Sequence, residues 1–219
     1  MATAPIDTQS LQTELSEASE ALKLAVSSEQ QRQLLEYLLQ LHKWNKSYNL
    51  SGLHNIREML QLHVIDSLTL VPYIDATRVA DIGTGAGLPG MVLAIIRPDV
   101  HFTLIDSNSK KIRFLFQTAA MLGLNNVETV HSRADDHVME PMADIITSRA
   151  FSSLAQFITC SEHLLAPGGK WLAMKGQYPQ EEIEGLPPGV QLKECKPLHV
   201  PGVDAARHMV DIRRVDQQH

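Results

Sequence analysis

A glycine-rich stretch has the residue types and spacing of a ligand-binding loop. Residues 79–90 read Val-Ala-Asp-Ile-Gly-Thr-Gly-Ala-Gly-Leu-Pro-Gly, so an apolar run leads directly into closely spaced glycines. Glycine permits a tight turn and lets a ligand approach bare backbone, and Pro89 suits the first turn of a following helix. In an open α/β sheet, such a junction of strand, loop and helix forms a binding crevice.

An acidic residue ends the next apolar run. Asp106 closes His101–Asp106, nineteen residues after Gly87. A carboxylate at this point can accept hydrogen bonds from both ribose hydroxyls of an adenosine cofactor. The alternative is a helix cap, because Ser107–Ser109 precede an expected helix. The position of the glycine loop favours the ribose role.

Two cofactor classes fit this geometry. Residues 85–90 match the dinucleotide pattern G-x-G-x-x-G. The longer pattern Asp81-x-Gly83-x-Gly85-x-Gly87 is typical of class I methyltransferases, in which the early acid lies near the amino-acid end of the cofactor. Too few strands follow Lys175 to form the second half of a nicotinamide-binding sheet. We therefore predict S-adenosyl-L-methionine as the cofactor and keep an NAD-dependent oxidoreductase as the alternative.

The elements that must position these residues fall into two segments. Residues 8–75 repeat apolar side chains at helical spacing, whereas short apolar runs alternate with helical stretches from Thr77 onward, which predicts βαβ units and a parallel sheet. Two late runs, 190–196 and 208–215, are close enough in sequence to be antiparallel neighbours at one edge. We expect an N-terminal helical extension over residues 1–75 and a Rossmann-like α/β domain over residues 76–219. The other expected strands are Arg78–Ile82, His101–Asp106, Val127–His131, Ala143–Thr147 and Lys170–Lys175, and the expected helices between them are Pro89–Ile96, Ser109–Leu122 and Ser152–Leu165.

Composition limits the compartment and the partners. No apolar run is long enough to span a bilayer, and the first residues lack the features of a signal peptide. The two cysteines, Cys160 and Cys195, make neither a disulfide framework nor a zinc site. We expect a cytoplasmic protein with no metal and no membrane partner. The formal charge of -6 counts against a nucleic-acid partner, but the acids crowd the first thirty residues. The basic residues that can gather into a local patch are Lys43, Lys46, Arg57, Lys110, Lys111, Arg113, Arg207, Arg213 and Arg214.

Several further motifs occur in one order between about residues 34 and 213. They are Lys43-Trp44-Asn45, Asn49-Leu50, His63, Asp66-Ser67-Leu68, Asp81 to Gly90, Asp106-Ser107, Lys110-Lys111, Arg133-Ala134, Ser148-Arg149-Ala150-Phe151, Lys175-Gly176 and Arg207-His208. Together they resemble the ribosomal RNA small subunit methyltransferase G family, whose members methylate N7 of a guanosine in 16S rRNA. The resemblance implies a class I methyltransferase fold, a mostly parallel sheet with an antiparallel edge strand, and 16S rRNA, within the small ribosomal subunit or an assembly intermediate, as the substrate of a monomeric enzyme.

The resemblance also implies individual cofactor contacts, at Gly83, Leu88, Ala134, Asp135 and Arg149. Ala134 and Asp135 follow the third strand, where adenine would lie and where Asp135 could accept from its amino group. Arg149 follows the fourth strand, and its planar donors suit the cofactor's carboxylate or Asp81.

The chain departs from the family pattern at three positions. Leu62 replaces an arginine before His63, Ser51 replaces a threonine, and Arg213 replaces a lysine. The first two changes fall at expected RNA contacts.

Methylation of guanine N7 needs no general base, because N7 has a lone pair and no proton. The protein would contribute orientation and exclusion of water, with selection of an unpaired guanine by stacking and edge hydrogen bonds. We expect no catalytic triad. The candidates for orienting the substrate are Arg149, Lys175, His63 and Arg207.

Simpler interpretations compete with these roles. His63 can be a helix histidine bonded to Asp66, three residues later; Trp44 can belong to the core; and the basic residues between positions 110 and 113 can form a solvated helix face. A noncatalytic RNA- or protein-binding module on the same fold is a third function class, because fold alone does not fix function.

Overall fold

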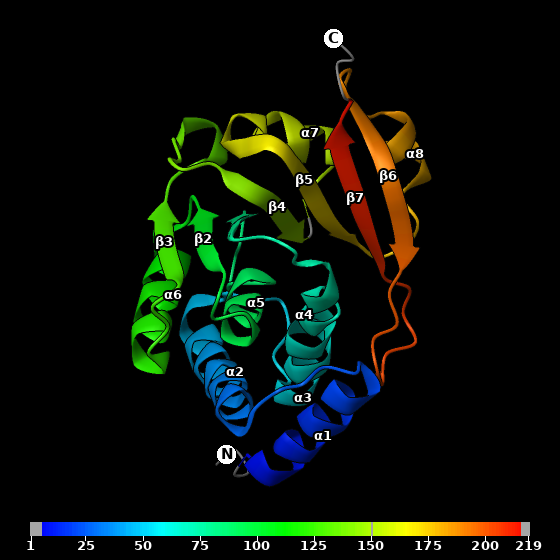
Figure 1. The fold of residues 1–219 in the computed structure, drawn as a ribbon. Coiled ribbons are helices and arrows are strands. Elements are labelled where there is room, and N and C mark those ends of the chain that lie inside the picture. Colours follow the sequence, from blue (N-terminus) through cyan, green and yellow to red (C-terminus); the bar gives the residue numbers. More distant parts are fainter. Residues whose placement is uncertain (1–5, 150, 216–219) are drawn as a thin grey trace.

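A seven-stranded sheet is the centre of the computed structural model, which describes residues 6–149 and 151–215. The strand order is β3-β2-β1-β4-β5-β7-β6 (Figure 1). β1 to β5 run parallel, and β7 runs antiparallel to both of its neighbours, β5 and β6. The predicted antiparallel edge is therefore confirmed. The strands are β1 (Arg78–Ile82), β2 (His101–Asp106), β3 (Val127–His131), β4 (Ala143–Arg149), β5 (Leu165–Lys175), β6 (Val190–Pro197) and β7 (His208–Arg214).

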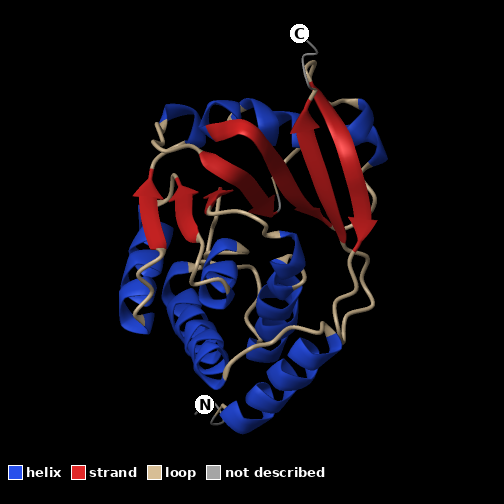
Figure 2. Ribbon diagram, in the orientation of Figure 1, coloured by secondary structure: helices blue, strands red, loops and turns tan. Residues whose placement is uncertain are grey.

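Helices cover both faces of this sheet (Figure 2). On one face lie α1 (Thr8–Ala21), α2 (Ser28–Tyr48), α3 (Ile56–Met59), the π-helix η1 (Leu60–Ile65), α4 (Asp66–Leu68), the 3-10 helix η2 (Val71–Tyr73), α5 (Gly90–Ile96) and α6 (Ser109–Leu122). On the other face lie α7 (Leu154–Thr159), the 3-10 helix η4 (Glu162–Leu164) and α8 (Gln180–Glu184). A short 3-10 helix, η3 (Ala134–Asp136), follows β3.

The alternation of side chains along each strand produces two cores. On β1, Val79 packs with the N-terminal helices, whereas Ala80 and Ile82 pack against α7. Successive strand residues point to opposite faces, so a strand covered on both faces needs apolar residues at nearly every position. This requirement explains the continuous apolar runs in the sequence.

The N-terminal helices share a core with the sheet and hold the glycine loop. Helix α2 begins at a capping box between Ser27 and Gln30. On its buried face, Tyr37 packs against Phe114 of α6 and donates a hydrogen bond to the carbonyl of Ala86, at 2.8 Å. The predicted boundary near residue 75 falls between η2 and β1, and the division into two segments stays a prediction.

Strand β4 extends to Arg149, two residues beyond its expected end at Thr147. Two other elements differ more from the sequence-based expectation. The helix expected over Ser152–Leu165 is α7 alone, followed by η4, because the Ser161 hydroxyl bonds the Phe157 carbonyl at 2.6 Å and also accepts from Trp171. Such local bonding competes with continuation of a helix. β5 starts at Leu165 rather than Lys170, and its register with β4 shifts near Ala143. Among the described residues, no helix is long and apolar enough to cross a membrane.

Candidate active site

The glycine loop connects β1 to α5 in a conformation that requires glycine. Gly83, Gly85 and Gly87 have φ values of 65°, 63° and 94°, in the left-handed region. A Cβ on Gly87 would lie 2.6 Å from the Leu115 side chain of α6. Gly87 therefore allows the loop to pack on α6, while Gly83 and Gly85 present backbone to the cavities described below.

Asp81 holds this loop in place from its buried side. Its side chain is fully buried, and Oδ2 accepts hydrogen bonds from the Thr84 hydroxyl at 2.6 Å and the Gly90 amide at 2.8 Å. Burial raises the pKa of Asp81 to about 7. Oδ1 has no hydrogen-bond partner among the residues that the structure describes. The predicted contact of Asp81 with the cofactor stays a prediction.

Asp106 ends β2 beside the same loop. Its Oδ2 accepts from the Gly85 amide at 2.9 Å and lies 3.7 Å from Lys111 Nζ, and its Oδ1 accepts from the Asn108 amide at 2.8 Å. The N-cap of α6 is Asn108, which accepts from the Lys110 amide, so the capping interpretation of Asp106 is wrong. A carboxylate has about four acceptor positions, which leaves Asp106 capacity for a ligand.

A cavity of about 440 Å³ opens at the carboxyl ends of β1 to β4. Five of the predicted cofactor residues line it, namely Gly83, Asp106, Ala134, Asp135 and Arg149. Gly85 and Leu88 line a neighbouring cavity of about 340 Å³, together with Gly83, His63 and Arg149. A third cavity of about 400 Å³ contains all four predicted substrate-orienting residues: Arg149, Lys175, His63 and Arg207.

Arg149 lines all three cavities and is held by the π-helix. Its Nη1 donates to the Leu62 carbonyl at 2.7 Å and lies 3.3 Å from Asp66, and its Nη2 lies 3.0 Å from His63 Nδ1. Of the two carboxylates predicted to pair with Arg149, Asp81 is wrong, because Asp66 provides the carboxylate; the carboxylate of the cofactor stays a prediction. The next residue of the motif, Ala150, lies outside the described residues.

Polar contacts engage both ring nitrogens of His63. Nδ1 lies 3.0 Å from Nη2 of Arg149, which donates, and also 3.0 Å from the Leu62 carbonyl, which accepts, while Nε2 lies 2.5 Å from the Ser51 hydroxyl. Burial, reinforced by the positive charge of Arg149, lowers the pKa of His63 to about 4. The expected bond from His63 to Asp66 is wrong: the π-helix changes the angular spacing of these residues, and each side chain contacts Arg149 instead.

Asp66 joins two of the candidate arginines. Its carboxylate is buried, with Oδ2 facing Arg149 and Oδ1 accepting from Arg207 Nε at 3.1 Å. Burial raises the pKa of Asp66, and the two guanidinium groups limit that rise. Lys175, at the end of β5, pairs with Glu182 of α8 at 2.7 Å. Three elements distant in sequence thus place positive charges around the third cavity.

Sequence reasoning missed the contacts that build this centre. Asp66 and Ser51 belong to motifs noted above, but the partners of Asp66 are 83 and 141 residues away and Ser51 meets His63 across a turn, so no local spacing indicates the network. Phe151 also lines the first cavity, with its ring 3.5 Å from the position of a Cβ on Gly83.

The structure decides between the two interpretations of Trp44 and shows whether the predicted basic residues form one patch. Trp44 packs against the core, as one of the two interpretations holds. Arg57 pairs with Glu14 of α1, while Arg213 pairs with Asp211 and Arg214 donates to the Leu165 carbonyl. The nine basic residues therefore do not form one patch.

Comparison with known proteins supports one family. Residues 30–210 match the family described as rRNA small subunit methyltransferase G. A protein of that name from Marinobacter nauticus is 45% identical over 197 residues, 90% of this chain and 92% of the relative. Another from Laribacter hongkongensis is 46% identical over 202 residues, 92% and 98% of the two chains.

A solved structure supports the fold independently. A SAM-dependent methyltransferase from Thiobacillus denitrificans, solved in complex with S-adenosyl-L-homocysteine, aligns with a TM-score of 0.52 at 15% identity, over 69% of this chain and 90% of that one. This likeness confirms the predicted methyltransferase fold. The chain therefore belongs to the rRNA small subunit methyltransferase G family, and it is a methyltransferase.

Proposed function

We propose that this methyltransferase transfers a methyl group from S-adenosylmethionine to N7 of a guanine in 16S ribosomal RNA. S-adenosylmethionine is the methyl donor, as the sequence predicts. The observation that best supports the full proposal is the position of Arg149, which lines both the cavity beside Asp106 and the cation-rich cavity that contains Lys175 and Arg207.

The residues of the first cavity fit the cofactor. Gly83 exposes backbone at a left-handed turn, and the Asp106 carboxylate keeps acceptor capacity for the ribose hydroxyls. Asp135 is half-exposed at the cavity wall and can accept from the adenine amino group. Asp81 and Gly87 also hold the loop from behind, and their predicted contacts with the cofactor remain part of the proposal.

The chemistry needs little from the protein beyond position. When bound, S-adenosylmethionine supplies an electrophilic methyl group on a sulfonium. Guanine N7 has a free lone pair, so no residue has to remove a proton. His63 agrees with this requirement, because Arg149 and Ser51 engage its two ring nitrogens. The main contribution of the chain is to orient the base and exclude water.

The cations of the third cavity are suited to hold the guanine and its phosphate. Guanine presents O6 as an acceptor, which arginine and lysine donors recognise, and Arg207 and Lys175 are each only partly exposed there. Their own acids, Asp66 and Glu182, fix the side chains in place and reduce the entropy that binding would otherwise remove.

Membership in a methyltransferase family leaves the NAD-dependent oxidoreductase and the noncatalytic binding module without support. We further propose that the protein acts in the cytoplasm as a monomer on the small ribosomal subunit or an assembly intermediate. The absence of a membrane-spanning helix in the described residues agrees with this setting.

The test is methyl transfer to small subunits that lack the modification. The protein is incubated with labelled S-adenosylmethionine and such subunits, and the labelled base is mapped. We expect the label on N7 of one guanine. A label on a base carbon, a ribose oxygen or a protein side chain would refute the proposal even if the cofactor were correct.

A further inference from the structure

Four exposed basic residues on two neighbouring helices lack an acidic partner. Lys43 and Lys46 lie near the end of α2, and Lys110 and Arg113 lie in the first half of α6. Many basic residues elsewhere in the described chain pair with an acid within 4 Å, but none of these four does. In a chain with a net charge of -6, this is a local concentration of unneutralised positive charge.

Aromatic contacts show that the end of α2 and the first half of α6, which carry these cations, lie against each other. The Trp44 ring of α2 lies 5.6 Å from the Phe114 ring of α6 and 5.2 Å from the Tyr48 ring. Tyr48 is 44% exposed at the end of α2. We call the surface formed by Lys43, Lys46, Tyr48, Lys110 and Arg113 the α2–α6 rim; α2 and α6 lie side by side beneath β2 and β3 in Figure 1.

The α2–α6 rim leads into the candidate active site. Helix α2 ends at Tyr48 with Asn49 as its C-cap, and the following Leu50, Ser51 and Gly52 line the 340 Å³ cavity. Lys111, in the first turn of α6, lines both that cavity and the one beside Asp106. A chain lying along the rim would therefore reach the cavities that contain Arg149.

The charges of α6 are placed against the helix dipole. The N-terminal end of a helix favours acidic side chains and disfavours basic ones, yet the first turn of α6 has no acid and contains Lys110 and Lys111 after Ser109. A solvated face selected for stability would have the opposite pattern. This unfavourable arrangement points to a use for the positive charge that outweighs its effect on the helix.

We propose that the α2–α6 rim binds the sugar–phosphate backbone of the ribosomal RNA next to the target guanine, with Tyr48 stacking on a flanking unpaired base. The inference rests on the proposed function and names a surface outside the cavities. Phosphates complement the unpaired cations, and an exposed aromatic ring is suited to bases that are not paired.

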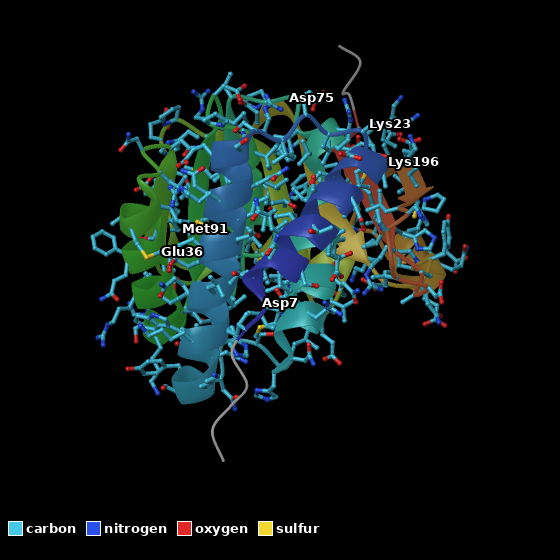
Figure 3. The ribbon with its side chains drawn as sticks, turned by 90° about the horizontal axis from the view of Figure 1, so that it is seen from below. Asp7, Lys23, Glu36, Asp75, Met91 and Lys196 are labelled. Carbon is cyan, nitrogen blue, oxygen red and sulfur yellow. The ribbon has the colours of Figure 1, made fainter. Side chains whose placement is uncertain are left out.

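The test compares three double variants that each remove two positive charges. Lys43→Gln/Lys46→Gln and Lys110→Gln/Arg113→Gln alter the rim. Lys193→Gln/Lys196→Gln is the matched control on β6, whose Lys196 lies on the other side of the molecule from Glu36 of α2 (Figure 3). All six side chains are exposed, so all three proteins should fold.

We expect each rim variant to raise KM for unmodified small subunits about tenfold or more, with a much smaller change in kcat. The slope of log KM against log salt concentration should fall by about two, one for each lost phosphate contact. Affinity for S-adenosylhomocysteine should not change, and the β6 control should match the wild type. Tyr48→Ala should raise KM about fivefold or more, and Tyr48→Phe should restore it because stacking is retained.

The outcomes separate this inference from the proposed function. If the wild type methylates small-subunit RNA but the rim variants keep its KM and salt slope, the inference is wrong while the function stands. An equal increase in KM in the β6 control would indicate a general charge effect and would also overturn it. If the rim variants are impaired on assembled subunits but normal on protein-free rRNA, the partner is a ribosomal protein and the RNA assignment fails.

Discussion

Replacing Arg149 with alanine tests how one side chain serves both stability and methyl transfer. Arg149 is largely buried and faces Asp66, whose side chain is only 3% exposed. The sequence alone predicts a solvent-exposed ion pair at the end of a strand. Such a pair would contribute on the order of 0–1 kcal/mol to the free energy of unfolding, and the melting temperature of the variant should hardly change. The structure replaces that expectation, because removing one partner of a buried pair typically costs about 3–5 kcal/mol.

Arg207 reduces this loss, since it still pairs with the other oxygen of Asp66 at 3.1 Å. We therefore expect Arg149→Ala to lower the free energy of unfolding by about 3 kcal/mol, which for a chain of this size lowers the melting temperature by about 6–12 °C. Methyl transfer should fall at least about a hundredfold, because a misplacement of about 1 Å has an effect of that size.

A double variant separates the two effects. In Arg149→Ala/Asp66→Asn the buried carboxylate is neutral, so we expect about 1–3 kcal/mol of stability to return through the coupling between neighbouring sites. Activity should remain lost, because the guanidinium is still missing. The measurements are calorimetric melting and single-turnover methyl transfer on the same preparations. An unchanged melting temperature in the single variant, or strict additivity in the double one, would refute the proposed coupling.

Three further predictions concern the cofactor loop and His63. Asp106→Ala should weaken binding of S-adenosylhomocysteine by about 1.5–3 kcal/mol; calorimetry that finds wild-type affinity would remove Asp106 from the ribose site. Gly87→Ala should lower the free energy of unfolding by about 3 kcal/mol through overpacking and strain, whereas Gly123→Ala, also at positive φ but with open space around its Cβ, should lose much less in the same urea titration. The pKa of His63 is about 4 in the folded protein, compared with an ordinary value of 6.5. Between these two pH values the unfolded chain binds more protons than the folded one. The free energy of unfolding should therefore rise with pH across this window, by up to ~3 kcal/mol. Comparing wild type with His63→Gln at pH 4.5 and pH 7 isolates this contribution from that of Asp81; equal pH dependence in both proteins would contradict it.

Local patterns were sufficient to predict most of the sheet. β1, β2 and β3 have the predicted bounds, because each is a short apolar run between turn residues and local spacing alone determines it. The glycine loop and Asp106 were also accessible, since one element positions each of them and the crossover brings them together. The start of β5 was harder to predict, because Pro167, Gly168 and Gly169 look like a turn but lie within the strand.

The centre around Asp66 was not accessible from the sequence. It depends on a π-helix, which has no local apolar pattern of its own, and on partners 83 and 141 residues away in the chain. A side chain such as Arg149 could be assigned to the crevice by its place at the end of β4, but its acidic partner could not. Long-range pairing of charged groups is a property of tertiary packing, which spacing along one element does not encode.

The docking of α2 onto later elements affects the order in which the nascent chain can fold. Gln33 of α2 donates to the carbonyl of Leu122, at the end of α6, and Tyr37 reaches the loop after β1. Residue 122 leaves the ribosome 74 residues after residue 48. At about 5–20 residues per second, the part of α2 that packs on α6 waits roughly 4–15 seconds for its partner, while α1 already contacts α2. Apolar surface exposed for this long favours aggregation or chaperone binding, so we expect substitutions on this part of α2 to change yield in the cell as well as activity.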